Sequence, residues 1–153
     1  MIHEVLHIGV TVTDMEQSIA FYRDVLGLKM VGRLRMHGPR TDRLFGWENA
    51  DCRVTYWQGS DNLAMPPVEL IQFTKTPIEK RSMSLRRTGV SEICFRVQNI
   101  DKVYERLRQK GVEFLSAPQY FDFRSVGMGQ SKAVYFRDPD GTILELIESV
   151  ETK

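Results

Sequence analysis

Two glutamates interrupt apolar, strand-like segments at corresponding places in the two halves of the chain. Glu69 lies in the segment VELI at 68–71, and Glu145 lies in the segment LELI at 144–147. Burying an ionised carboxylate without a partner costs several kcal/mol, so each glutamate must be paired, protonated or bound to a cation. The two residues are therefore candidates for chemistry rather than for packing alone.

His7 and Glu92 form a second pair of candidates. The segment LHIGVTVTDM at 6–15 aligns without a gap on SEICFRVQNI at 91–100, and the alignment places His7 on Glu92. Because side chains alternate along a strand, both residues point away from the face that packs against a helix. They are therefore expected on the open face of their strands.

All four residues converge if the two halves pack about a pseudo-twofold axis. One imidazole and three carboxylates fit a small space only around a divalent cation, because their like charges would otherwise force protonation. The sequence therefore predicts a metal site formed by His7, Glu69, Glu92 and Glu145. Two alternatives remain open: a hydrogen-bonded structural role for His7, and pairing of Glu145 with an arginine such as Arg96.

The elements that position these residues occur twice, in the order βαβββ. Each opening strand runs into a good N-cap residue, Asp14 or Asn99, which predicts the start of a helix. The strands expected after each helix are 28–34, 53–58 and 68–73 in the first half and 112–115, 132–136 and 143–147 in the second. The organisation predicts one domain over 1–153, with module one at 1–76, a connector at 77–87 and module two at 88–150.

These segments together resemble the vicinal oxygen chelate superfamily, the group of glyoxalases, bleomycin-resistance proteins and extradiol dioxygenases. The similarity covers LHIGVTVTDMEQSIAFYRDVLGLKM, VELIQF, EICFRVQNIDKVYERLRQKGVEF and YFRDPDGTILELIE. It implies an α+β fold in which two tandem βαβββ modules form a cupped mixed sheet with helices on the outside. It also implies a divalent metal, with Mn, Fe, Ni, Co and Zn as the candidates, that coordinates two adjacent oxygens of a substrate.

Carried over by position, the ligands that the resemblance implies are His7, Glu69 and Glu145. The fourth position, usually histidine in lyase and epimerase members, is Glu92 here. This difference leaves three possibilities. They are a metal site rich in carboxylates, a site of three ligands with Glu92 as a base, and a metal-free binding protein.

The expected function is that of a metal-dependent lyase or isomerase of the glyoxalase type. It would act on a small substrate with vicinal oxygens through a metal-stabilised enolate. Glu145 or Glu69 would serve as ligand and possible base, and Glu92 is the alternative base. One alternative is a metal-free protein that binds an antibiotic or an aromatic metabolite. A ring-cleaving dioxygenase is the less favoured alternative. The iron sites of such enzymes use two histidines and one carboxylate, and only one histidine is suitably placed here.

Further polar and aromatic residues are candidates for substrate binding. A basic cluster in or after the second strand could meet an anionic group of the substrate. Aromatic and polar side chains elsewhere are candidates for the walls of the cup. The candidates for substrate binding are His37, Arg40, Tyr56, Gln72, Tyr120 and Arg124.

Composition excludes several classes of protein. The chain has 153 residues, and its 21 Lys and Arg balance 20 Asp and Glu, so no basic field favours nucleic acid. No apolar run approaches the roughly 20 residues that span a bilayer, and the start of the sequence lacks the pattern of a signal peptide. Cys52 and Cys94 lie in strand-like segments and are expected to be buried free thiols, as in a reducing compartment. Together these features predict a cytoplasmic protein whose partner is a small molecule. The resemblance to the superfamily also implies that the protein forms a homodimer.

Overall fold

The computed structural model describes residues 5–60 and 68–150 and divides into two compact units, Met1–Arg81 and Ser82–Lys153. Each unit contains one four-stranded mixed sheet with a helix on one face. The predicted α+β class and the repeated βαβββ order are both confirmed. In the part of the chain that the structure describes, no helix is long and apolar enough to cross a membrane.

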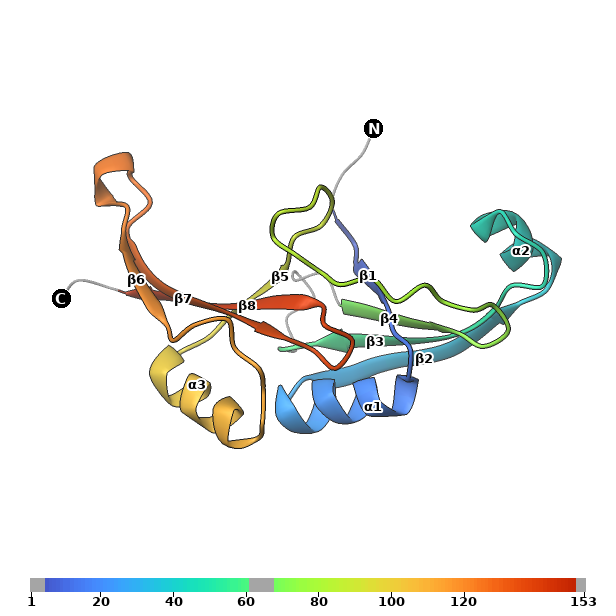
Figure 1. Ribbon diagram of the computed structural model, residues 1–153, viewed down its shortest axis with the longest axis horizontal. Helices are drawn as coiled ribbons and strands as arrows, with labels where there is room; N and C mark the ends of the chain where they lie inside the picture. Colours follow the sequence, from blue (N-terminus) through green and yellow to red (C-terminus); the bar gives the residue numbers. More distant parts are fainter. Residues whose placement is uncertain (1–4, 61–67, 151–153) are drawn as a thin grey trace. The chain divides into compact units, whose positions relative to one another are not determined.

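The first unit follows the predicted order, with one additional helix (Figure 1). The sheet order is β1-β4-β3-β2, in which β1 runs parallel to β4 and the other pairs are antiparallel. Helix α1 continues directly into a π-helical segment, η1. The elements are β1 (Ile8–Thr11), α1 (Met15–Ala20), η1 (Phe21–Val25), β2 (Lys29–His37), α2 (Pro39–Phe45), β3 (Asp51–Gln58) and β4 (Val68–Phe73).

Helix α1 covers one face of the first sheet. It begins at Asp14, whose carboxylate accepts hydrogen bonds from the backbone N–H groups of Glu16 and Gln17, as expected of an N-cap. Its continuation packs Tyr22 beside Trp57, and both side chains are fully buried. Because side chains alternate along a strand, the residues next to Trp57 in β3 point to the opposite face of the sheet, which α1 does not cover. The residues paired with them in β2 and β4 point to the same face. We call this the open face.

Strand β2 and helix α2 extend the first unit beyond the prediction. The strand continues past residue 34 to His37, and α2 follows with Pro39 at its start and Gly46 at its end in a left-handed conformation (φ 76°). Asp51 is buried at the adjoining end of β3. Hydrogen bonds from Arg35 and the nearby Lys75 ammonium hold the pKa of Asp51 well below its usual range.

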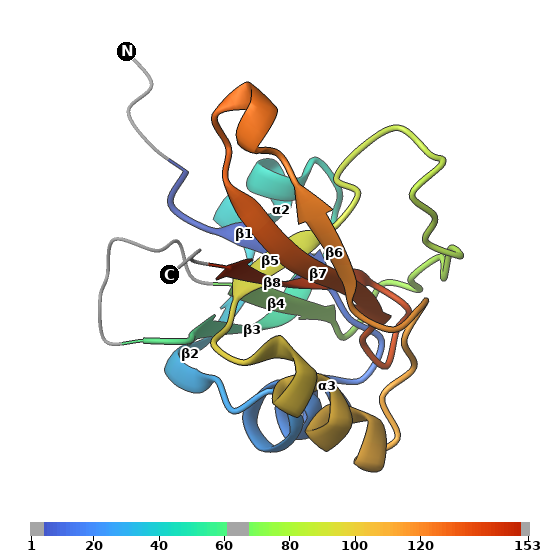
Figure 2. The same cartoon turned by 90° about the vertical axis from the view of Figure 1, so that its left-hand side faces the viewer.

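The second unit repeats the sheet order as β5-β8-β7-β6. Helix α3 lies against one face, and the hairpin of β6 and β7 extends beyond the rest of the sheet (Figure 2). The carboxylate of Glu148 accepts hydrogen bonds from the backbone N–H groups of Asn99 and Ile100 at the start of α3. The elements are β5 (Ile93–Arg96), α3 (Ile100–Gln109), β6 (Gln119–Asp122), η2 (Arg124–Val126), β7 (Gln130–Arg137) and β8 (Ile143–Val150).

The prediction of a strand at 112–115 is wrong. Only Phe114 makes an isolated bridge, to Phe136, and the edge strand is β6 instead. The ring of Phe114 lies 4.6 Å from that of Tyr104 on α3 and 5.5 Å from that of Phe136, measured between centroids. Packing under the helix therefore determines the course of this segment, and local strand propensity does not.

Of the two cysteines expected to be buried, only Cys52 is buried, while Cys94 is exposed. Both are free thiols. Cys94 pairs with Glu145 across β5 and β8, whereas its neighbour Ile93 is buried on the α3 side. The exposure of Cys94 follows from its place on the sheet face that α3 does not cover, which is the open face of the second unit.

Candidate functional site

Glu69 is the central polar residue on the open face of the first unit. Strand register places Gly9 of β1 on one side of it and Tyr56 of β3 on the other. The Tyr56 hydroxyl donates a hydrogen bond of 2.6 Å to Glu69 Oε1. Glu69 Oε2 lies 3.3 Å from His7 Nε2. The partners that a buried carboxylate requires are thus present, and each of its two oxygens has a different one.

Gly9 leaves space beside the oxygen that faces His7. A Cβ atom at this position would lie 3.2 Å from Glu69 Oε2, which is tighter than an ordinary contact. The His7 ring meets the Tyr56 ring edge-on, with 5.8 Å between centroids. The His7 side chain is 38% exposed, while that of Glu69 is 11% exposed. A ligand that approaches the open face can therefore reach both residues.

The spacing of His7 and Glu69 fits two ligands of one divalent ion. Metal–nitrogen and metal–oxygen bonds of about 2.1 Å at angles between square and tetrahedral place two ligand atoms roughly 3.0–3.4 Å apart. The observed distance of 3.3 Å between His7 Nε2 and Glu69 Oε2 lies in this range. Imidazole nitrogen with carboxylate oxygen is also a donor set that divalent transition metals accept.

Tyr56 is held in its protonated form. The hydrogen bond to Glu69, burial and the negative charge of Glu69 together raise the pKa of Tyr56 to about 12. Deprotonation would remove the donor and place two negative groups in contact, which explains the direction of the shift. Tyr56 therefore remains a neutral hydrogen-bond donor throughout the physiological pH range.

Glu145 occupies the corresponding place in the second unit. Its register partners are Cys94 of β5 and Tyr135 of β7, so all three share the open face. Although Cys94 as a residue is exposed, neighbouring protein atoms partly desolvate its thiol. This desolvation, hydrogen bonding to Glu145 and the charges of Glu145 and Glu92 raise the pKa of Cys94 to about 12. Burial and then the same two carboxylates raise the pKa of Tyr135. The negative charges of Glu92 and Glu145 therefore both raise the pKa values of the same two groups, Cys94 and Tyr135.

The two units place different groups beside their equivalent glutamates. Tyr56 and Tyr135 occupy the same register position, as do Gly9 and Cys94. In the first unit the phenol donates a hydrogen bond to the carboxylate, while in the second unit the carboxylate lies beside a thiol whose pKa it raises. The alignment of His7 on Glu92 also places Gly9 on Cys94, so the sequence contained a signal for Cys94. Tyr135 was missed because its place beside Glu145 depends on strand register.

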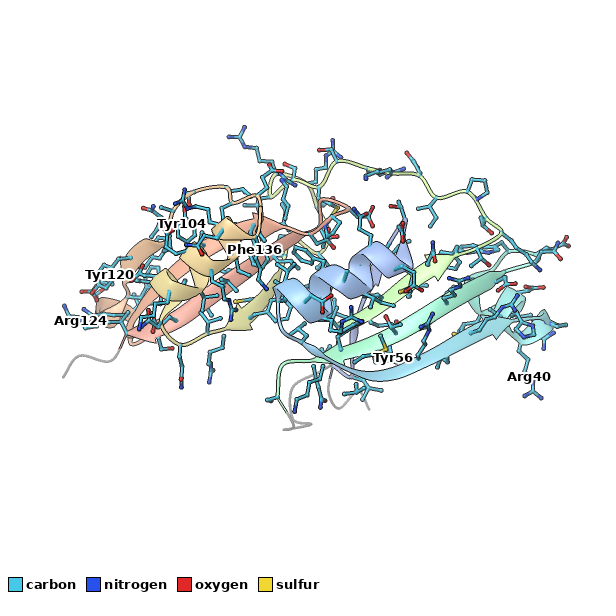
Figure 3. All side chains as sticks on the ribbon, turned by 90° about the horizontal axis from the view of Figure 1, so that it is seen from below. Arg40, Tyr56, Tyr104, Tyr120, Arg124 and Phe136 are labelled. Carbon is cyan, nitrogen blue, oxygen red and sulfur yellow. The ribbon has the colours of Figure 1, made fainter. Side chains whose placement is uncertain are left out.

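Among the substrate-binding candidates of the first unit, the structure brings only Tyr56 to Glu69. Gln72 instead donates to the backbone carbonyl of Thr13 at 2.9 Å. His37 lies at the far end of β2, opposite Asp51. Figure 3 shows Arg40 on α2, away from Tyr56.

In the second unit, Tyr120 and Arg124 are not brought to Glu145. Tyr120 is paired with Lys132, whose ammonium bonds to Asp101 of α3, so Tyr120 lies on the helix side of the sheet. Arg124 makes hydrogen bonds of 2.6 to 3.0 Å to the Asp122 carboxylate at the end of the hairpin (Figure 3).

A different aromatic pair shares the open face of the second unit. Phe121 is paired with Ser131 of β7, which is on the same face as Tyr135. Its ring stacks on that of Phe123 with 5.7 Å between centroids. The two rings are 41% and 43% exposed and form the aromatic surface of this face, whereas Tyr120 lies on the helix side.

Within residues 5–60 and 68–150, no three histidine, cysteine, aspartate or glutamate side chains form a complete metal-binding group. The first unit supplies the pair His7 and Glu69. The second unit supplies Glu145 with Glu92 nearby. Each unit therefore has its own cluster of candidate ligands on the open face of its own sheet, and we call each cluster a half-site.

Two βαβββ units with ligand-type carboxylates on their open faces define the class of this protein. A family model described as the Glyoxalase/Bleomycin resistance protein/Dioxygenase superfamily matches residues 4–146. The chain belongs to this superfamily.

Similar proteins cover nearly the whole chain. A virulence protein of Salmonella typhimurium is 24% identical, over 98% of this chain and 87% of that protein. A probable lactoylglutathione lyase of Synechocystis sp. is 24% identical over 97% of both. The crystal structure of a glyoxalase family protein from Bacillus cereus has a TM-score of 0.78 at 21% identity, with 97% of each chain covered. This structural similarity supports the fold.

The raised pKa of Cys94 predicts a slow thiol. At pH 8 its alkylation by iodoacetamide should be about one to two orders of magnitude slower than that of a free cysteine, because the thiolate fraction is small and its greater nucleophilicity compensates only in part. Glu145→Gln should accelerate the reaction, while Glu105→Gln, on the outside of α3, should not. Mass spectrometry of the Cys94 peptide measures the rate. Equal rates in Glu145→Gln and the unchanged protein would contradict the assignment.

Proposed function

We propose that this protein is a divalent-metal-dependent enzyme of the glyoxalase type that moves a proton on a small substrate with two adjacent oxygens. The observation that carries the proposal is the 3.3 Å distance between His7 Nε2 and Glu69 Oε2 on an open sheet face. The similarity to a probable lactoylglutathione lyase supports a lyase or isomerase within the superfamily.

The proposed ligands are His7, Glu69 and Glu145, with Mn, Fe, Ni, Co or Zn as the ion. When bound, such an ion supplies Lewis acidity, which makes the hydrogen on the carbon beside a substrate carbonyl easier to remove. Glu145 belongs to this set because it is the repeat equivalent of Glu69 and lies on the corresponding open face. The proposal thus needs one half-site from each unit.

Glu92 is proposed as the general base. Three carboxylates near one doubly charged ion leave an excess of negative charge, so one of them is free to accept a proton. A Glu92 oxygen would take the proton from the hydroxyl-bearing carbon beside the carbonyl and return it to the former carbonyl carbon, while the hydroxyl proton passes to the former carbonyl oxygen. The hydroxyl-bearing carbon thus becomes the new carbonyl, and the glutamate is unchanged after each cycle. Glu145 is the alternative base.

The second candidate function is metal-free binding of an aromatic small molecule. The observation that favours it is the exposed stack of Phe121 and Phe123 on the same face as Glu145. Aromatic surfaces of this kind bind planar ligands by stacking. Elemental analysis separates the two functions, because only the enzyme requires a bound metal.

The first test of the metal-dependent function is Glu145→Ala. This variant should lose most of its bound metal while it remains folded, because the apolar neighbours of Glu145 in β8 still pack in the core. Metal content is measured by mass spectrometry on protein purified without chelator, with Glu105→Ala as the control. Added metal should also raise the melting temperature of the control but not that of Glu145→Ala. Unchanged metal content in Glu145→Ala would refute this ligand set.

Glu92→Gln separates the base from the ligands. It should retain metal but lower turnover by about two to four orders of magnitude, the range expected for loss of general base catalysis. Steady-state kinetics on an active substrate, together with metal analysis of the same sample, provides the measurement. A wild-type rate in Glu92→Gln would show that Glu92 takes no part in proton transfer.

We also propose a homodimer. Strands β1 and β2 are the edges of the first sheet, and β5 and β6 are those of the second. Met30, Val31 and Leu34 of the edge strand β2 are exposed apolar residues. Unpaired strand edges favour association with another chain. Light scattering at micromolar concentration should give twice the chain mass of 17.7 kDa. A single species at the monomer mass would contradict the dimer.

A further inference from the structure

The two oxygens of Glu69 are not equivalent. Oε1 accepts the Tyr56 hydroxyl at 2.6 Å, whereas Oε2 lies 3.3 Å from His7 Nε2. Oε2 is also the oxygen that Gly9 leaves unobstructed. The surroundings of Glu69 therefore engage Oε1 in a hydrogen bond with Tyr56 and leave Oε2 beside His7.

A free glutamate would not maintain this arrangement. Its side chain has three rotatable bonds, and the terminal carboxylate rotates easily, so either oxygen or both could face an ion. The hydrogen bond from Tyr56 removes this freedom before a ligand arrives. Groups that orient metal ligands in this way commonly change metal affinity although they do not touch the metal.

The position of Tyr56 is itself well determined. Its backbone pairs with Glu69 across the antiparallel β3 and β4 strands, and its ring packs edge-on against the His7 ring. The same aromatic residue therefore contacts both ligand candidates of the first unit. Substrate binding, the role that the sequence suggested for Tyr56, does not account for these two contacts.

We propose that Tyr56 is a positioning residue, whose hydroxyl holds Glu69 Oε1 so that Oε2 is presented with His7 as a single-oxygen metal ligand. The inference rests on the proposed metal site. It adds a residue that acts through Glu69 and does not itself bind the ion. The second unit differs, because there Cys94 stands at the position of Gly9, beside the equivalent Glu145.

Titration of the metal-free protein with Co²⁺ tests the proposal. Tyr56→Phe removes only the hydroxyl and should weaken Co²⁺ binding by about 10- to 100-fold. The visible absorption of bound Co²⁺ should also weaken, because a released Glu69 can bind through both oxygens and raise the coordination number. The matched control is Tyr104→Phe, the same change on α3, which should retain wild-type affinity. Wild-type affinity and spectrum in Tyr56→Phe would overturn the proposal.

A metal-free measurement separates this inference from the proposed function. Crystal structures of the metal-free wild type and Tyr56→Phe should show Glu69 Oε2 beside His7 in the former and a rotated carboxylate in the latter. Failure of the wild type to bind Co²⁺ would refute the metal-dependent function, and the role of Tyr56 in orienting Glu69 would then be decided by these structures alone. An unchanged Glu69 orientation in Tyr56→Phe would overturn it.

Discussion

The buried carboxylate of Glu69 is the constraint on which the first half-site depends. A charged group in the middle of an apolar strand is stable only if its oxygens are satisfied, and the neighbouring strands supply what is needed. Tyr56 on β3 donates to one oxygen, while Gly9 on β1 leaves room beside the other. The parallel and antiparallel registers of β4 with its two neighbours therefore determine the polar chemistry of the open face.

The repeat provides the same frame twice but not the same chemistry. Glu145 has the register position of Glu69, yet Cys94 stands where the first unit has Gly9, and the carboxylate raises the pKa of its thiol. The first half-site therefore has a histidine–carboxylate pair, and the second has a carboxylate beside a thiol and the charge of Glu92. In the proposed reaction the base comes from the second unit, where Glu92 stands at the position that His7 has in the first.

Much of the fold follows from the sequence. Alternation of side chains in short strands places Glu69 on the open face, and the side chain of Asp14 caps the start of a helix. The gapless repeat adds the order of elements in each unit and the equivalence of His7 with Glu92. These properties are local or periodic, so a linear sequence contains them.

Only the tertiary structure decided which residues lie beside the ligand candidates. Tyr56 and Glu69 are neighbours because β3 and β4 pair in one register, and a shift by one residue would place Tyr56 on the helix side. The same cause places Phe121 rather than Tyr120 on the open face, and it depends on β6 being the edge strand in place of 112–115. The sequence by itself determined the repeated order of elements and the face on which Glu69 lies, but not α2 or the edge strand β6. Pairing between strands far apart in the chain decided the contacts, because register depends on the packing of the whole sheet and not on local residue preference.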